Sequence, residues 1–580
     1  MAKTTTVAAM LLVGTQAEAF RFKVGEWDAY ADSVFSASAA MRVENSSHVG
    51  SANPSGNAKI FRDAGDVYAT PVSLLTDFGM DKDGFGFLTR FSYTYDYTIM
   101  HKDCSNCERP NVWPNAPAGF NQGTPGTEFI DGIDSSAQNL AGNKFTLYDA
   151  FVYGSWDVFG GHPLNVRVGK QVINWGESNI QGGGISQMMN PTDLSKATTP
   201  GTDVKETLIP QESVYLNFGF NDEISLEAYY TWNWRKSTFI GTGTYYSPFD
   251  FLGDGFNPDL FVRGIEKSGE DEPSGGTYGI NMHFIIPSWN YADLGFYYIR
   301  SHAFNPRLGL NEDYVTHPDA ARPGADTLAG YQWIYAEDQD TYAVSLNGEA
   351  FWDASFALEF NLKTDFYDTR ECRNLHGISG IGVPDLGGVT VGAAFGLGPN
   401  AYFGNNDAQG TIPGCDIEAS DVYTLLGNWT RSVGTDFLGA DKISTILDVS
   451  MVWIDGLSWG DQTDRVNTGT VDTGRFDGVD ALDRPITDFS WGYTAVMALQ
   501  YDNAFANINV SPTLIFVHNV EGYTPFNAGA MVENQRIIVA KVGFSYLSST
   551  TVDLQYTTWL GTAGTSEDKD NVSIVFKRSF

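Results

Sequence analysis

The sequence contains no run of eighteen apolar residues, so we expect no transmembrane helix. If the chain lies in a membrane, it must cross it as strands. Positive charge is also scarce, because 35 Lys and Arg residues stand against 70 Asp and Glu residues and the net charge is −35. Binding to nucleic-acid phosphates needs clusters of Lys and Arg. The charge balance therefore argues against a general nucleic-acid binder.

Cysteine is scarce too. The chain has only Cys104, Cys107, Cys372 and Cys415, and an even number in an exported protein indicates disulfides. Three pairings are formally possible, and we favour Cys104 with Cys107 and Cys372 with Cys415. The C-x-x-C spacing also occurs in redox and metal sites, but it lacks a βαβ setting and a second pair at zinc spacing. The eight histidines show no metal spacing either, so we expect no metal and no cofactor.

Aromatic residues and glycine, in contrast, are abundant. An aromatic content of 14% and 62 glycines without a collagen period fit one large antiparallel sheet. The mean hydropathy of −0.21 is mildly polar, as expected when only alternate residues face lipid. Seven aspartates between residues 461 and 488 predict a solvated loop near the lipopolysaccharide layer. A dedicated Ca²⁺ site would need oxygen ligands at ordered spacing, and no EF-hand pattern is present.

Alternation of apolar and polar residues is clearest between residues 211 and 235. Leu216 and Phe218 alternate with Tyr215 and Asn217, and the pattern continues beyond a tight turn. This is typical of a hairpin with one face toward lipid and one toward water. The same reading predicts eighteen strands, at 27–44, 66–80, 84–100, 143–158, 162–176, 211–220, 222–235, 274–287, 290–304, 341–352, 354–369, 421–434, 440–456, 490–504, 506–522, 536–549, 551–561 and 567–580.

The connections between these strands are alternately short and long. An even strand number with short periplasmic turns and long extracellular loops is what a bacterial outer-membrane barrel requires. We therefore predict an all-β protein with a single transmembrane antiparallel β-barrel of about 18 strands, whose long extracellular loops fold partly into the lumen. Both predicted disulfides then fall within single extracellular loops, 101–142 and 370–420.

The two ends of the sequence agree with this localisation. Residues 1–19 read as a secretory signal peptide, with Lys3, a short apolar core and a small-x-small site that ends at Ala19. Residues 20–580 are then the barrel. The last strand ends on Phe580, with Phe576 and Ile574 on the same face, and this resembles the signal that directs barrels to the Gram-negative outer membrane.

Several positions are candidates for contact with a passenger molecule. Glu227 and Glu349 lie on the wet face, where a selectivity role competes with simple solvation. The Gly-rich stretch 377–399 is mostly apolar, so it should fold into the lumen, pack on another loop, or bind an apolar ligand through Val391 and Phe395. The same three alternatives apply to the aromatic loop at 239–262. Residues 456–460 formally match the Gly-x-Ser-x-Gly of hydrolases, but they end a strand and enter a loop. We therefore expect no enzyme.

The segment Val166 to Pro210 resembles a known family. It contains the residues of a G-[RK]-Q-V-x-x-W-G-E-S motif followed by Gly-Ile and Asn-Pro-x-Asp-Leu, namely Gly169, Lys170, Gln171, Val172, Trp175, Gly176, Glu177, Ser178, Gly184, Ile185, Asn190, Pro191, Asp193 and Leu194. These are similar to the proteobacterial family called domain of unknown function 1302, and the likeness extends from Phe20 to Phe580. No reaction or substrate comes with the resemblance.

The resemblance implies an outer-membrane protein, often encoded beside a periplasmic lipid-binding-like partner and a resistance-nodulation-division exporter, or among genes for catabolism of hydrophobic compounds. The predicted barrel itself would contact outer-membrane lipid and lipopolysaccharide. The resemblance also implies one of two roles for Trp175, Glu177 and Asn190. They either hold an inward-folded loop in position or contact a ligand. We predict an outer-membrane channel or transporter for hydrophobic or amphipathic molecules. The alternatives are a general diffusion porin and a non-transporting barrel that anchors a surface or periplasmic complex.

Overall fold

The computed structural model describes residues 20–46, 60–103, 132–176, 182–247, 265–310, 329–350, 353–366, 382–383, 389–390, 420–455, 487–524, 531–547, 549–561 and 568–580. The predicted signal peptide at residues 1–19 lies outside the described residues. So do the four cysteines, and the predicted disulfides stay predictions.

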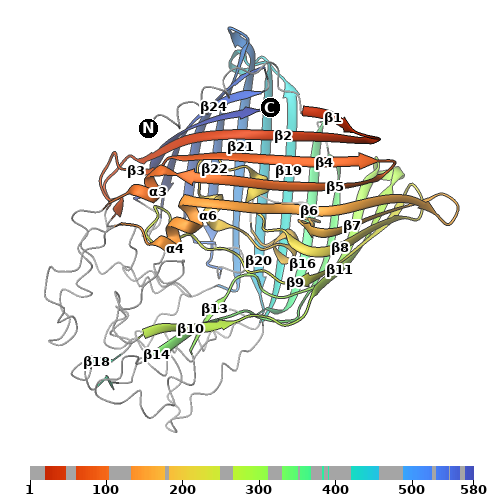
Figure 1. Ribbon diagram of the computed structural model, residues 1–580, viewed down its shortest axis with the longest axis horizontal. Coiled ribbons are helices and arrows are strands. Elements are labelled where there is room, and N and C mark those ends of the chain that lie inside the picture. Colours follow the sequence, from red (N-terminus) through yellow and green to blue (C-terminus); the bar gives the residue numbers. More distant parts are fainter. Residues whose placement is uncertain are drawn as a thin grey trace.

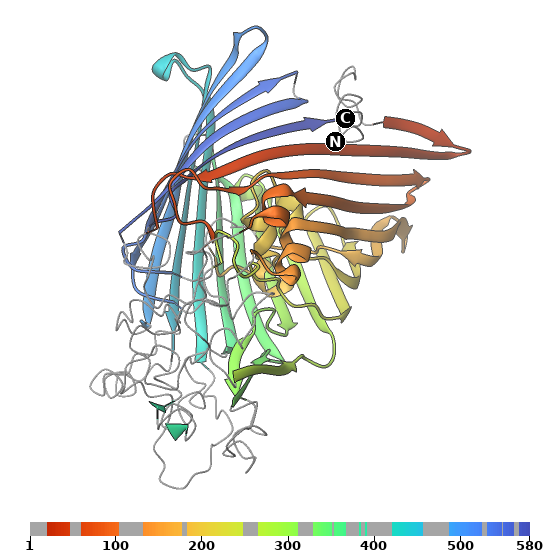
Figure 2. The ribbon, with the colours of Figure 1, turned by 60° about the vertical axis from the view of Figure 1, so that its left-hand side comes forward.

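Eighteen antiparallel strands form one closed ring (Figures 1 and 2). Each strand pairs with the next one along the ring, and β25 returns to pair with β2. In ring order the strands are β2 (Trp27–Arg42), β4 (Pro71–Lys82), β5 (Phe85–Asp96), β6 (Asn143–Val158), β7 (His162–Gln171), β8 (Gln211–Gly219), β9 (Ile224–Asn233), β11 (Thr277–Ile286), β12 (Ala292–Ser301), β15 (Gln339–Ala350), β16 (Ala354–Phe366), β19 (Ser420–Gly434), β20 (Lys442–Ile454), β21 (Phe489–Phe505), β22 (Ile508–Glu521), β23 (Arg536–Tyr546), β24 (Thr550–Leu560) and β25 (Asn571–Ser579).

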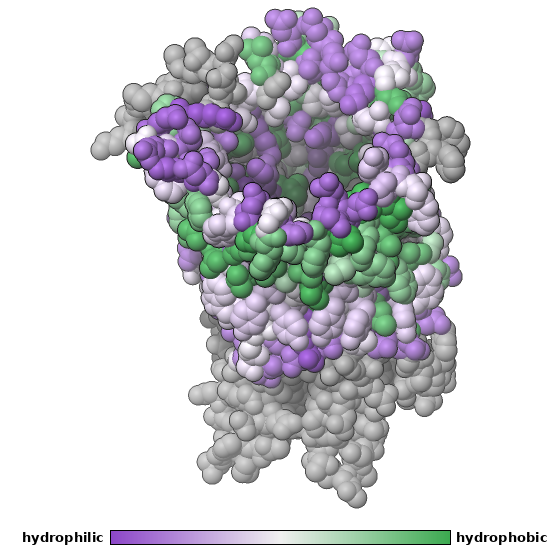
Figure 3. Space-filling view, turned by 90° about the vertical axis from the view of Figure 1, so that its right-hand side faces the viewer, coloured by the Kyte–Doolittle hydropathy of each residue, from purple (hydrophilic) through white to green (hydrophobic). Residues whose placement is uncertain are grey.

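The eighteen predicted strands and their closure into a barrel are thus confirmed. Closure pairs every strand edge, and only helices and closed barrels satisfy their backbone hydrogen bonds inside a bilayer. Large apolar side chains such as Leu358, Leu554 and Ile574 are exposed on the outer face. Figure 3 shows the resulting hydrophobic band on the barrel wall, flanked by hydrophilic residues. None of the helices in the described part of the chain is long and apolar enough to span a bilayer.

Three predicted strands differ in detail from the structure. The strand predicted at 84–100 ends at Asp96, because the Asp96 carboxylate accepts a hydrogen bond from the Ile99 backbone N–H and caps helix α3 (Tyr97–His101). The strand predicted at 162–176 ends at Gln171, where the chain turns inward. The strand predicted at 66–80 is interrupted at Thr70, whose N–H donates to Asp96, and this leaves the short strand β3 (Val67–Ala69) before β4.

The barrel closes where β2 pairs with β25, and we call this pairing the seam. A further short strand, β1 (Phe20–Val24), lies beside it. β25 pairs with β2 between Arg42 and Val34, and Phe580 exchanges backbone hydrogen bonds with Ser33 at 2.8 and 2.9 Å. β1 pairs with β2 from Ala31 to Trp27 and so continues the same row beyond Phe580. β1 was not among the strands predicted from the sequence.

The remaining elements are short. They comprise strands β10 (Ile265–Asp271), β13 (Arg307–Leu310) and β14 (Ala329–Ile334) in one small sheet, β17 (Gly382–Val383) paired with β18 (Val389–Thr390), and helical segments α4 (Ser135–Ala137), η1 (Gln138–Gly142), α5 (Ser186–Met189), α6 (Leu194–Ala197), η2 (Val204–Glu206), η4 (Pro287–Trp289) and η7 (Phe437–Gly439).

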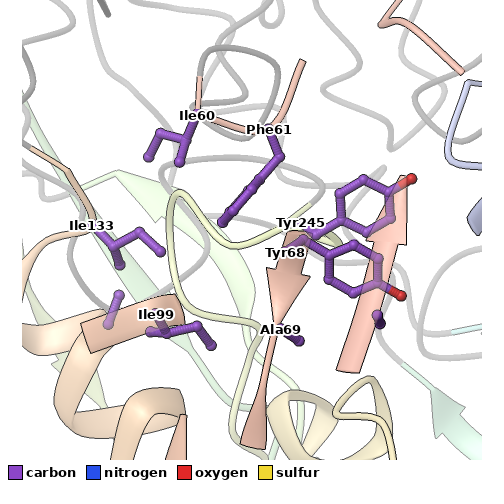
Figure 4. Close-up of a cluster of buried hydrophobic side chains, with 9 residues drawn as sticks. Ile60, Phe61, Tyr68, Ala69, Ile99, Ile133 and Tyr245 are labelled. Carbon is purple, nitrogen blue, oxygen red and sulfur yellow. The ribbon is translucent and has the colours of Figure 1, made fainter. Parts of the chain in front are cut away.

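At the long-loop end of the barrel, apolar residues of several connections pack together. Figure 4 shows Ile60, Phe61, Tyr68, Ile133 and Tyr245 in this cluster. The rings of Tyr68 and Tyr245 are stacked with their centroids 4.0 Å apart. The described part of the aromatic loop that follows β9 is therefore packed against other loops.

Candidate functional site

The inner wall of the barrel carries the polar residues of the alternating pattern. On β5, Arg90 donates to both carboxylate oxygens of Asp77 at 2.6 and 2.8 Å and to Asp149 at 2.7 Å. Glu227 accepts hydrogen bonds from Asn217 and Asn281 of the two neighbouring strands. Most of these charges are paired along the wall, which leaves the lumen polar but locally neutralised.

The described residues of the connection between β7 and β8, 172–176 and 182–210, fold into the lumen, and we call them the inward loop (Figure 2). Its first contact with a distant wall lies on β16. The Gly183 carbonyl oxygen accepts from Lys363 Nζ at 2.9 Å, and the Ile185 N–H donates to Glu359 at 2.7 Å. Ser450 on β20 donates to the Gly182 carbonyl oxygen at 3.3 Å. We call these contacts the β16 anchor.

A second set of contacts lies at the barrel seam. Ser38 on β2 donates to the Pro200 carbonyl oxygen at 2.6 Å, and Ser36 donates to that of Gly201 at 3.3 Å. Lys577 on β25 donates to the Thr202 carbonyl oxygen at 3.5 Å. We call these contacts the seam anchor. The inward loop therefore leaves the wall at β7 and touches it again both at β16–β20 and at β25–β2, so it crosses the lumen.

Glycine is required at one position in each anchor. Gly183 has φ +105°, and a Cβ there would lie 3.1 Å from Thr424 Cγ2. Gly201 has φ +85°, and a Cβ there would lie 2.6 Å from Ser36 Oγ. Both backbones combine a left-handed conformation with close approach to the wall, which glycine tolerates best.

The base of the inward loop holds two of the predicted site residues. Trp175 packs against Tyr229, with ring centroids 5.1 Å apart, within a buried cluster that includes Ile185 and Ile299. The buried Asn190 side chain donates to the Ile173 carbonyl oxygen at 2.7 Å. The structure thus gives both residues loop-positioning contacts, and a ligand role for them stays a prediction.

The middle of the inward loop is held by buried ions. Lys196 donates to Thr94 Oγ1 at 2.6 Å and to Glu206 at 3.3 Å, and both ionic side chains are almost fully buried. Burial lowers the pKa of the Lys196 ammonium, and the Glu206 carboxylate acts in the opposite direction. Asp193 caps α6 through the Lys196 N–H and also binds Lys144 at 2.8 Å. Because buried ions need their partners, this part of the loop has a defined position.

One arc of the inner wall is apolar, which was not predicted from the sequence. Ile446, Val496, Ile515 and Val539 are paired side by side across β20, β21, β22 and β23. They share the inner face with Ser450, which reaches the inward loop, and each is half-buried. Val517 and Ile537 form a second row beside them. We call these six residues the apolar lane.

A sequence signal for the apolar lane was present. Residues 514–517 and 537–540 are apolar at every position, so both faces of these strands are apolar rather than only the outer one. The lane lies on the arc β20–β23, and the arc between the two anchors consists of β21–β24. The wall between the two anchors therefore includes this apolar surface.

The other predicted site residues in the described part of the chain do not join Trp175 and Asn190 at the base of the inward loop. Glu349 lies near the short-turn end, exposed and in contact with Asn290. Glu177, Val391 and Phe395 lie outside the described residues. The structure brings Trp175 and Asn190 together at the base of the inward loop, but it does not bring Glu227 and Glu349 into that group.

Comparison with known proteins supports the resemblance drawn from the motif. The model of the family described as protein of unknown function (DUF1302) matches residues 1–580. The chain belongs to this family. The DUF1302 motif of this protein spans the end of β7 and the first part of the inward loop, so the residues that carry the resemblance are those that begin the lumen crossing.

The DUF1302 protein also resembles solved outer-membrane structures. OccAB1 of Acinetobacter baumannii is 10% identical with a TM-score of 0.40, over 97% of this chain and 99% of that chain. OpdK of Pseudomonas aeruginosa is 10% identical with a TM-score of 0.41, over 95% and 98%. A BenF-like porin of Pseudomonas fluorescens Pf-5 is 8% identical with a TM-score of 0.40, over 95% and 98%. No curated protein matches the chain.

The closed ring and its apolar outer band make this DUF1302 protein an outer-membrane β-barrel, which confirms the predicted localisation. In bacterial barrels the short turns face the periplasm and the long loops face the exterior. Figure 3 shows the short-turn mouth hollowed and lined largely by hydrophilic residues. The lumen opens at this mouth and is crossed by the inward loop.

Proposed function

We propose that the protein is an outer-membrane channel for amphipathic or hydrophobic molecules, which pass through the lumen without chemical conversion. The observation that carries the proposal is the apolar lane. Its six side chains belong to the inner face, where alternation in a barrel ordinarily places polar residues. A water-filled lumen gains nothing from such a lane, whereas an apolar passenger does.

The size of the effect can be estimated from area. Removal of apolar surface from water is worth about 25 cal/mol per Å², so contact over roughly 100 Å² of the lane would stabilise a passenger by about 2.5 kcal/mol. Two asparagines in the lane should remove about half of this contact. Because about 1.4 kcal/mol corresponds to a tenfold change in binding, the loss should be close to tenfold.

The test is block of ion current through the purified full-length protein in a planar bilayer, with 4-phenylbutanol as the amphipathic probe. The double variant Val496→Asn/Ile515→Asn should need about tenfold more probe for the same block, with little change in open conductance. Ala357→Asn is the matched control, because Ala357 lies on the inner face of β16 away from the lane. It should behave as the natural protein does.

A general diffusion porin is the second candidate, favoured by the hydrophilic short-turn mouth. Two results together would favour this candidate over our proposal. The probe would block the natural protein and the lane variant equally, and removal of the charge at Glu227 or Glu349 would alter ion selectivity. A natural protein that is folded in the bilayer but conducts no ions would instead favour the third candidate, a non-transporting scaffold.

A further inference from the structure

Arg167 on β7 differs from the other cations of the inner wall. Arg90 pairs with Asp77 and Asp149, Lys541 pairs with Asp553, and Lys144 pairs with Asp193. Lys363 and Lys577 donate instead to backbone carbonyl oxygens of the inward loop. Among the residues that the structure describes, no carboxylate lies within ion-pair distance of the Arg167 guanidinium and no group accepts a hydrogen bond from it. It is a half-buried cation without a direct ion-pair partner among these residues, and its charge acts on Asp149 only at longer range.

Two aromatic rings hold Arg167 in place. Its guanidinium carbon lies 4.2 Å from the ring centroid of Tyr215 on β8 and 5.7 Å from that of Phe151 on β6. Stacking on aromatic rings uses the flat faces of a guanidinium, whereas its N–H donors point outward from its edges. The aromatic contacts therefore orient the side chain without consuming its hydrogen-bonding capacity.

The nearest carboxylates are already engaged. Asp149 accepts from Arg90 through one oxygen and from the Val172 N–H through the other. The two oxygens of Glu227 accept from Asn217 and Asn281. Arg167 is thus left with free donors although the chain as a whole is strongly acidic.

Arg167 lies on the inner face of β7, between the inward loop and the short-turn mouth. It lies four residues before Gln171, where the inward loop begins, which is about 13 Å toward the short-turn mouth at about 3.3 Å per residue. The mouth on this side is hollowed (Figure 3). In the ring, β7 and β21 are separated by eight strands in either direction, so Arg167 and the apolar lane lie on opposite walls.

We propose that Arg167 is the binding site for the carboxylate group of an amphipathic organic acid that uses this channel. A guanidinium binds a carboxylate through two parallel N–H···O bonds, and a cation without a direct ion-pair partner offsets the repulsion that an anion meets in an acidic protein. This inference rests on the proposed channel function and adds a chemical class to it. The aromatic rings of Phe151 and Tyr215 offer apolar surface beside the site for the body of the same molecule.

The test compares two probes with the same body, 4-phenylbutanoate and 4-phenylbutanol, in the current-block measurement on the full-length protein. Arg167→Gln should weaken block by the acid tenfold or more and leave block by the alcohol within twofold. Arg167→Lys, which keeps the charge without the fork of donors, should give an intermediate loss. Lys442→Gln is the control for removal of one positive charge, because Lys442 is exposed at the short-turn end.

Three outcomes would overturn the inference. They are equal loss for acid and alcohol, no loss for either, and equally strong competition by inorganic phosphate, which would make Arg167 a general anion site. Failure of the channel proposal gives a different result. In that case 4-phenylbutanol blocks the Val496→Asn/Ile515→Asn variant as strongly as it blocks the natural protein. If Arg167→Gln does not form a heat-modifiable folded barrel, the comparison of acid and alcohol is made with Arg167→Lys. This variant retains a cation over both rings.

Discussion

The ammonium of Lys363 on β16 donates a hydrogen bond of 2.9 Å to the backbone carbonyl oxygen of Gly183, 180 residues away along the chain. This bond joins the inward loop to a wall that is separated from β7 by β8, β9, β11, β12 and β15. It holds Gly183 of the inward loop against this wall, and we expect it to limit the width of the passage.

Replacement of Lys363 with Met should widen the channel. The Gly183 carbonyl oxygen keeps only its hydrogen bond from Asn361, at 3.2 Å, and loss of a buried hydrogen-bond partner costs about 1–3 kcal/mol. We expect a higher and noisier single-channel conductance. Glu359→Gln is the matched control, because the glutamine carbonyl can still accept from the Ile185 N–H. Identical conductance in Lys363→Met and the natural protein would show that the β16 anchor does not define the passage.

Replacement of Gly201 with Ala should release the loop from the seam. The new Cβ would lie 2.6 Å from Ser36 Oγ, and the alanine would also be strained by its left-handed backbone. Gly160→Ala is a close control, since Gly160 has φ +92° and a Cβ there meets no atom within 4 Å. Strain alone costs about 1–2 kcal/mol. Proteolysis within residues 182–202 should therefore become faster in Gly201→Ala only, and equal rates in both variants would contradict the seam anchor.

The Lys196–Glu206 pair should show strong coupling. Lys196→Ala leaves the buried Glu206 carboxylate without its cation, and removal of one partner of a buried ion pair costs about 3–5 kcal/mol. The double variant Lys196→Ala/Glu206→Gln should recover much of this loss, because no unpaired charge is left. Denaturant unfolding of the folded barrel measures both. Additive effects of the two single changes would show that the pair does not position the inward loop.

Deletion of Phe580 should impair assembly. The residue ends the strand that closes the barrel, and both its backbone groups are bonded to Ser33. We expect less heat-modifiable protein in the outer membrane with normal export across the inner membrane. Phe580→Trp keeps an aromatic end and the backbone bonds and should assemble normally. Full assembly of the deletion variant would argue against a sorting role for the terminal residue.

The strand number and the two faces of the barrel could be read from the sequence because both depend on local alternation. Consecutive residues such as Leu226 and Glu227 on β9 point to opposite faces of the strand whatever their cross-strand partners are. The predictions were wrong where a side chain overrode this pattern. Asp96 is the clear case, because its carboxylate caps a helix within the predicted strand at 84–100.

The candidate site was decided by tertiary structure. Gly183 meets Lys363, and Gly201 meets Ser36, only because the ring closes and brings distant strands around one lumen. The apolar lane likewise depends on register, since its residues come from four strands and the β21–β22 pairing contains two irregularities. Alternation assigns each residue to a face, but a one-residue shift between strands changes which side chains lie beside one another. For that reason the sequence by itself determined a barrel with a wet inner face, and only the folded chain decided what crosses its lumen and which wall is apolar.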